Sequence, residues 1–178
     1  CCLKAILTVK NVAHPKEEMK MAKLDGKVAI ITGAAAGVGK ATAILFAAEG
    51  AAVSICDIDE DKLQQTANEI TSNGGRVLAR ICDLNNFDAI QAFVEATVAE
   101  YGTLDILVNN AAYFGYGGIM ETTQEIWDTS FAVNVEAPWH LMRLCFPILM
   151  SKGGKVINMI SRGGLQGVKG LASYDASK

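Results

Sequence analysis

The sequence predicts an α/β protein in which a parallel sheet is covered by helices on both faces. Short runs rich in β-branched and other apolar residues alternate along the chain with longer amphipathic runs. The short runs are apolar at successive positions, which is typical of strands buried on both faces. Because helices separate the strands and such crossovers are right-handed, we expect a doubly wound sheet in three layers, α/β/α.

The strands are expected at residues 28–32, 52–56, 77–82, 104–108 and 155–160. The first helix begins near Val38, and apolar residues at helical spacing mark the next two helices, first Leu63, Ala67 and Ile70, then Phe87, Ile90, Val94, Val98 and Tyr101. A long helical stretch over 123–150 contains Pro138 and Pro147, which are expected to kink or stop it.

The composition of the 178-residue chain predicts one globular domain. A hydrophobic content of 51% and a formal net charge of −3 exclude a disordered chain and give no electrostatic case for a nucleic-acid partner. No apolar run reaches the roughly 18 residues that span a bilayer, so no membrane association is expected. The five cysteines include no C-x-x-C pair. Cys56, Cys82 and Cys145 lie singly in apolar surroundings, which predicts reduced core thiols and a cytoplasmic protein.

A glycine-rich turn, T-G-A-A-A-G-V-G, joins the first strand to the first helix. A diphosphate group needs backbone N–H groups that point at it, no Cβ in the way and the positive end of a helix dipole. The turn meets these conditions, and the residues expected to contact a dinucleotide there are Gly33, Gly37, Val38 and Gly39. The alternative is an ordinary tight turn between strand and helix, for which glycines alone suffice.

Asp57 ends the second strand, 18 residues after Gly39. A carboxylate at this place accepts hydrogen bonds from the adenosine ribose hydroxyls and repels a 2′-phosphate. No lysine or arginine occupies residues 34–36, where a cation for that phosphate could sit. Both observations favour NAD over NADP. The alternative is that Asp57, or Asp59, caps the helix that follows.

From about Leu24 to Lys178 the sequence resembles the compact, non-extended branch of the short-chain dehydrogenase/reductase family. The glycine turn matches the family motif T-G-x-x-x-G-x-G, and the segment 174–178 matches Y-x-x-x-K. The family's Asn-Asn-Ala-Gly reads N-N-A-A over residues 109–112, with Ala112 in place of the glycine. The resemblance implies a Rossmann-like fold and further cofactor contacts from Asp83, Asn110, Ala111, Tyr174 and Lys178.

The resemblance also implies four catalytic residues, Asn134, Ser161, Tyr174 and Lys178. A tyrosine with its ordinary pKa of ~10 is a poor base at neutral pH. Lys178 lies four residues further on, so the two share a helical face and the ammonium favours the phenolate. Ser161 orients the substrate oxygen, although a serine after a strand is usually a cap. Asn134 holds a water that relays the proton. No cluster with metal-ligand spacing is present, so no metal site is expected.

The expected function is that of an oxidoreductase that transfers a hydride between NAD(H) and a secondary alcohol or ketone, similar to 3-oxoacyl reductases or to alcohol, sugar or steroid dehydrogenases. The expected partners are a small-molecule alcohol or carbonyl substrate and further copies of the chain, in a homodimer or homotetramer. One alternative is a truncated dinucleotide-binding fragment without turnover. Another is an epimerase or dehydratase, which is disfavoured because the extended branch spaces its glycines as G-x-x-G-x-x-G.

The ends of the chain carry two further expectations. Residues 1–20 lack the apolar run and cleavage site of a signal peptide and are expected to be an extension outside the fold. Residues 21–178 are expected to form the dinucleotide-binding domain. Because Lys178 lies inside the Y-x-x-x-K motif, we expect that domain to be incomplete at its C-terminus and to lack the last strands of the sheet.

Overall fold

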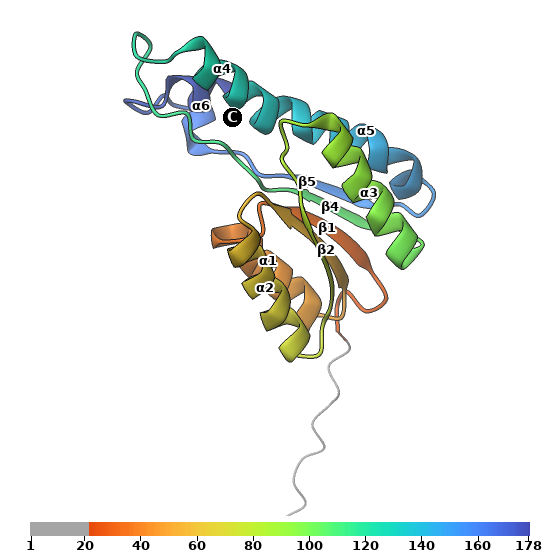
Figure 1. Ribbon diagram of the computed structural model, residues 1–178. Coiled ribbons are helices and arrows are strands. Elements are labelled where there is room, and N and C mark those ends of the chain that lie inside the picture. Colours follow the sequence, from red (N-terminus) through yellow and green to blue (C-terminus); the bar gives the residue numbers. More distant parts are fainter. Residues whose placement is uncertain (1–21) are drawn as a thin grey trace, which may run out of the picture.

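The computed structural model describes residues 22–178, which form a five-stranded parallel sheet between two layers of helices (Figure 1). The predicted extension over 1–20 lies outside the described residues. The strand order is β3-β2-β1-β4-β5, and every neighbouring pair is parallel. This order confirms the predicted doubly wound arrangement. The strands are β1 (Val28–Thr32), β2 (Ala52–Asp57), β3 (Arg76–Ile81), β4 (Ile106–Asn109) and β5 (Lys155–Asn158).

Successive residues of the central strand point to opposite faces and enter two separate apolar clusters. Ile30 packs in the cluster below α3 (Phe87–Tyr101) and α5 (Ala137–Met150). Ile31 packs in the cluster below α1 (Gly37–Ala48) and α2 (Glu60–Ser72). Figure 1 shows the two helix pairs on opposite sides of the sheet. The continuous apolar run in β1 therefore reflects burial on both faces, as the sequence predicts.

The exposed edge of the sheet is an exception to the predicted burial. All four residues of β5 are exposed, and the strand ends at Asn158, two residues earlier than expected. β3, at the opposite edge, is only partly buried. The burial on both faces that continuous apolar runs predict is therefore found for β1, β2 and β4 only.

The helical stretch predicted over 123–150 is interrupted, but not at its prolines. It begins as α4 (Gln124–Phe131), widens into a π-helical turn at Ala132–Glu136 and continues as α5. The expectation that Pro138 and Pro147 stop the helix is wrong. Pro138 lies in the first turn of α5, next to the π turn, and Pro147 lies inside α5 on its exposed side, where water can reach unpaired carbonyl groups.

The cysteines differ from the prediction in one respect. Cys56, Cys82 and Cys145 are free and buried, as expected. Cys56 and Cys82 do not lie singly, however, because Cys82 directly follows β3, the strand that pairs with β2. Interaction with the Cys82 thiol and burial raise the pKa of Cys56 well above its usual value. Within residues 22–178, no helix combines the length and the apolar character that a membrane span requires.

Candidate active site

A cavity of about 610 Å³ lies where the carboxyl ends of the five strands meet. Open α/β sheets bind their ligands at this edge, beside the point where the strand order reverses. Every strand contributes lining residues from the loop that follows it. The lining residues include Gly33, Gly37, Val38, Asp57, Asp83, Asn110, Ala111, Ala112, Tyr113, Phe114, Val133, Met159, Ile160, Tyr174 and Lys178.

The glycine turn after β1 packs tightly against the loop after β4. The side-chain amide of Asn110 donates hydrogen bonds from Nδ2 to the carbonyl oxygens of Thr32 (2.9 Å) and Gly33 (3.1 Å). A Cβ on Gly33 would lie 2.7 Å from the Cα of Ala111, and a Cβ on Gly39 would overlap the carbonyl oxygen of Gly33. Gly37 has open space around it but a φ of +56°, which favours glycine. The three glycines are thus required for two different reasons.

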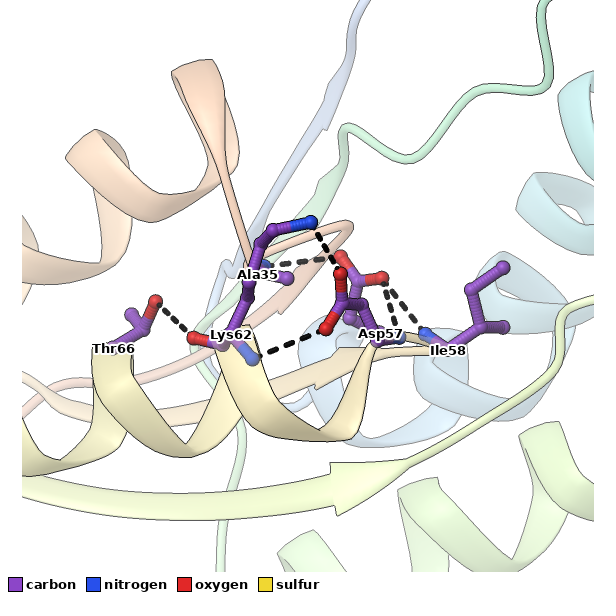
Figure 2. A network of polar contacts seen from close by, with 6 residues as sticks. Ala35, Asp57, Ile58, Lys62 and Thr66 are labelled. Atoms are coloured by element: carbon purple, nitrogen blue, oxygen red, sulfur yellow. Dashed lines mark hydrogen bonds and ion pairs between the residues drawn. The ribbon is translucent and has the colours of Figure 1, made fainter.

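Asp57 fixes the far side of the same turn (Figure 2). Its Oδ2 accepts a hydrogen bond from the backbone N–H of Ala35 at 3.0 Å. Its Oδ1 accepts from Ile58 at 2.8 Å and from Asp59 at 3.2 Å. The helix cap is Asp59, whose carboxylate accepts from the backbone N–H of Lys62 at the start of α2. The alternative in which Asp57 caps α2 is therefore wrong.

The negative charge of Asp59 is paired with the nearby Lys62. The Lys62 ammonium and backbone N–H both donate to Asp59, which lowers the pKa of this exposed carboxyl group and raises the pKa of Lys62. Asp59 does not line the cavity, whereas Asp57 does. The two neighbouring carboxylates thus have separate structural roles.

Tyr174 and Lys178 lie at the opposite end of the cavity from Asp57. Tyr174 belongs to the short helix α6 (Ala172–Ser177) and is 8% exposed. Lys178 directly follows α6, and its Nζ donates to the carbonyl oxygen of Met159 at 3.1 Å. Burial lowers the pKa of Lys178. The structure therefore brings both residues of the Y-x-x-x-K motif to the cavity that Asp57 lines.

Asn134 and Ser161 are close to this end but are not lining residues. The buried side chain of Asn134 accepts from the N–H of Tyr113 at 2.8 Å and donates to the carbonyl oxygen of Tyr113 at 3.0 Å and to Ser177 Oγ at 2.8 Å. Ser161 Oγ accepts from the N–H of Gly163 at 3.0 Å and so caps a 3-10 turn. Both side chains hold neighbouring segments in place.

Several lining residues were not expected from the sequence. Tyr113 and Phe114, directly after the Asn-Asn-Ala-Ala segment, and Met159 and Ile160, after β5, surround the Tyr174 end of the cavity. The aromatic run Y-F-G-Y over 113–116, placed directly after a strand, is the signal that could have identified the first two. Ala112 needs no strained backbone, because among the described residues only glycines have a positive φ.

Comparison with known proteins identifies the family. A profile of the short chain dehydrogenase family matches residues 27–178. The chain is 44% identical over 154 residues to an uncharacterized oxidoreductase of Thermotoga maritima, a match that covers 86% of this chain and 61% of the relative. The chain belongs to the short-chain dehydrogenase family. It spans about three fifths of the length of the curated relatives that it matches.

Two solved structures share the fold closely. A xylitol dehydrogenase bound to NAD⁺ superposes with a TM-score of 0.83 at 27% identity, covering 88% of this chain and 61% of that one. A metagenomic short-chain oxidoreductase in complex with NADP superposes with a TM-score of 0.82 at 39% identity, covering 87% and 71%.

The packing of the glycine turn generates a stability prediction for the natural protein that contains this chain. Gly39→Ala places a methyl group where the Gly33 carbonyl oxygen lies, so the turn must shift, and we expect a loss of roughly 1–3 kcal/mol in the free energy of unfolding. The control is Gly37→Asn, since asparagine tolerates a positive φ and nothing lies within 4 Å of the Cβ position. Urea denaturation measures both variants. Equal destabilisation of the two would contradict the packing argument.

Proposed function

We propose that the natural protein containing this chain is an oxidoreductase that transfers a hydride between NAD(H) and a secondary alcohol or ketone. The observation that carries this proposal is that one cavity is lined both by the glycine turn with Asp57 and by Tyr174 with Lys178. Family membership and the nicotinamide dinucleotides in two related structures support it. The free, buried thiols support a reducing, cytoplasmic compartment.

The residues present fit a dinucleotide. The positions at which Gly33 and Gly39 exclude a Cβ lie beside the N-terminus of α1, where backbone N–H groups favour a diphosphate. We assign the diphosphate to Gly33, Gly37, Val38 and Gly39, and the adenosine to Asp57 and Asp83. Asn110, Ala111, Tyr174 and Lys178 would then contact the nicotinamide half. When bound, the nicotinamide ring supplies the hydride donor or acceptor.

The charges around Asp57 support a preference for NAD. Among the described residues, Lys178 is the only lysine or arginine that lines the cavity, and it lies at the end away from Asp57. Lys62, the nearest cation in sequence, is paired with Asp59. A 2′-phosphate next to Asp57 would therefore meet a carboxylate without a compensating cation, and we propose that NADP binds more weakly for this reason.

The charges around Asp57 predict the outcome of binding measurements on the two cofactors. We expect calorimetry to give a dissociation constant for NAD at least about tenfold lower than for NADP, which corresponds to about 1.4 kcal/mol. Asp57→Ala should narrow the gap, because it removes the charge that repels the 2′-phosphate. The matched control, Asp59→Ala, removes a carboxylate two residues away that does not line the cavity, and it should leave the ratio unchanged. Equal dissociation constants in the unmutated protein would reject the preference.

We assign the proton transfer to Tyr174. In reduction of a ketone its phenol donates a proton to the substrate oxygen, and in oxidation of an alcohol its phenolate accepts that proton. The neighbouring Lys178, whose pKa is lowered by burial, gives up a proton more readily than an ordinary lysine and would resupply Tyr174.

We assign supporting roles to Ser161 and Asn134. Ser161 Oγ accepts a hydrogen bond from Gly163, which leaves its own O–H available to orient the substrate oxygen. Asn134 bonds to Ser177, the residue before Lys178, and so positions the start of the proton relay.

The assignment of Tyr174 predicts a separation of binding from turnover. Tyr174→Phe keeps the ring and its packing but removes the proton, so turnover should fall at least about 100-fold while the NADH dissociation constant stays nearly unchanged. Steady-state kinetics and fluorescence titration measure the two quantities. Tyr116→Phe, which removes a phenol outside the cavity lining, is the control and should keep full turnover. If Tyr174→Phe retained more than a tenth of the activity, Tyr174 would not be the acid–base group.

We further propose that the natural protein is a homodimer or homotetramer. One side of α5 carries exposed large apolar residues, namely Trp139, Phe146 and Met150, whereas Leu141 and Cys145 on its other side are buried against the sheet. Such an apolar face is typical of a surface that packs against another copy.

Light scattering at micromolar concentration tests this proposal, and we expect at least twice the protomer mass. Phe146→Glu places a charge on the apolar face and should shift the mass toward the monomer. Gln65→Glu, at an exposed position of α2, is the control and should leave the mass unchanged. A monomer mass for the unmutated protein would overturn the proposal.

A further inference from the structure

Three aromatic rings, those of Tyr174, Phe114 and Tyr116, are stacked in a row at the Tyr174 end of the cavity. The Phe114 ring stacks on the Tyr174 ring with centroids 4.4 Å apart and an interplanar angle of 14°. Tyr116 lies further out, 6.4 Å from Phe114 at 22°. Phe114 is 48% exposed and lines the cavity, whereas Tyr116 is 75% exposed and does not. A half-exposed phenylalanine thus covers one face of the ring to which we assign proton transfer.

The position of Phe114 is fixed by its two neighbours in the chain. Both backbone polar groups of Tyr113 are hydrogen bonded to the side chain of Asn134. The carbonyl oxygen of Gly115 accepts from Ser173 Oγ at 3.3 Å, and a Cβ on Gly115 would lie 2.6 Å from Ser130 Oγ. Because the residues before and after Phe114 are both anchored, its ring is held over Tyr174 by the fold and not by chance contact of a loose loop.

Apart from Lys178 and the Tyr113 hydroxyl, the rest of this end of the cavity is apolar. The lining residues around Tyr174 are Ala112, Tyr113, Phe114, Val133, Met159 and Ile160. The charged residues that line the cavity are Asp57, Asp83 and Lys178, and the two carboxylates lie at the other end. Within residues 22–178, the Tyr174 end therefore contains no side-chain carboxylate that could bind the hydroxyl groups of a sugar, and its one cation, Lys178, donates to the carbonyl oxygen of Met159.

We propose that Phe114 determines the substrate class, and that the class is a ketone or secondary alcohol with an aromatic substituent next to the reacting carbon. An aromatic substituent can pack offset or edge-to-face against the Phe114–Tyr174 pair, while the carbonyl oxygen points at the Tyr174 hydroxyl. Removal of this substituent from water also stabilises the complex. The inference rests on the proposed oxidoreductase function and adds the residue that selects the substrate.

The test compares three ketones, 1-phenyl-1-propanone, 2-butanone and dihydroxyacetone, as substrates of the natural protein with NADH. We expect the highest kcat/KM for the phenyl ketone. Phe114→Ala should lower this value at least about tenfold, mainly through KM, and should change the value for 2-butanone less than about threefold. Phe114→Leu keeps an apolar side chain without a ring and should give an intermediate loss. It also replaces the alanine variant in the comparison if that variant does not fold.

Tyr116→Ala is the matched control, since it removes a neighbouring ring that does not line the cavity. It should leave all three values unchanged, and the NADH dissociation constant should be the same in every variant. Equal losses for all three ketones in the Phe114 variants, or no preference for the phenyl ketone, would overturn the inference and leave the proposed function standing. Absence of NADH oxidation with every ketone in the unmutated protein would overturn both.

Discussion

The arrangement of the cavity depends on the contact between the chain leaving β1 and the chain leaving β4. One amide, that of Asn110, holds the two successive carbonyl oxygens of Thr32 and Gly33, and Gly33 has no Cβ to separate the two segments. β1 is central in the sheet, so this contact ties the turn to both halves of the structure. If the contact were lost, the start of α1 and the loop that carries Tyr113 and Phe114 would no longer be held in register.

The fold could be predicted from the sequence because its main determinants are local. A parallel strand buried on both faces gives a continuous apolar run, and Asp59 and Asn86 mark the starts of α2 and α3 through hydrogen bonds that reach at most three residues along the chain. The π-helical turn could not be predicted in this way. The contacts of Asn134 in that turn reach Tyr113, 21 residues before it, and Ser177, 43 residues after it.

The same distinction applies to the candidate site. Asp57 could be placed at the cavity because it ends a strand at the carboxyl edge of the sheet, whereas Tyr174 and Lys178 were placed there by the resemblance of residues 174–178 to the family motif Y-x-x-x-K. The ring pair of Phe114 and Tyr174 joins residues 60 positions apart, and no periodicity or spacing in the chain indicates it. The proximity of Cys56 to Cys82 was likewise missed, because it depends on β2 and β3 being neighbours in the sheet.

The hydrogen bonds of Asp57 have a consequence for the energetics of any ligand that reaches it. Three backbone N–H groups already restrict this carboxylate to one orientation, so its conformational entropy is lost when the chain folds and not when a ligand arrives. An approaching pair of hydroxyl groups therefore meets acceptors that do not have to be ordered first. The same carboxylate accepts a hydrogen bond from Ala35 in the glycine turn. A ligand that displaces Asp57 would therefore also displace the turn. The adenosine and the diphosphate of one ligand would thus contact a single hydrogen-bonded unit, which consists of Asp57 and the glycine turn.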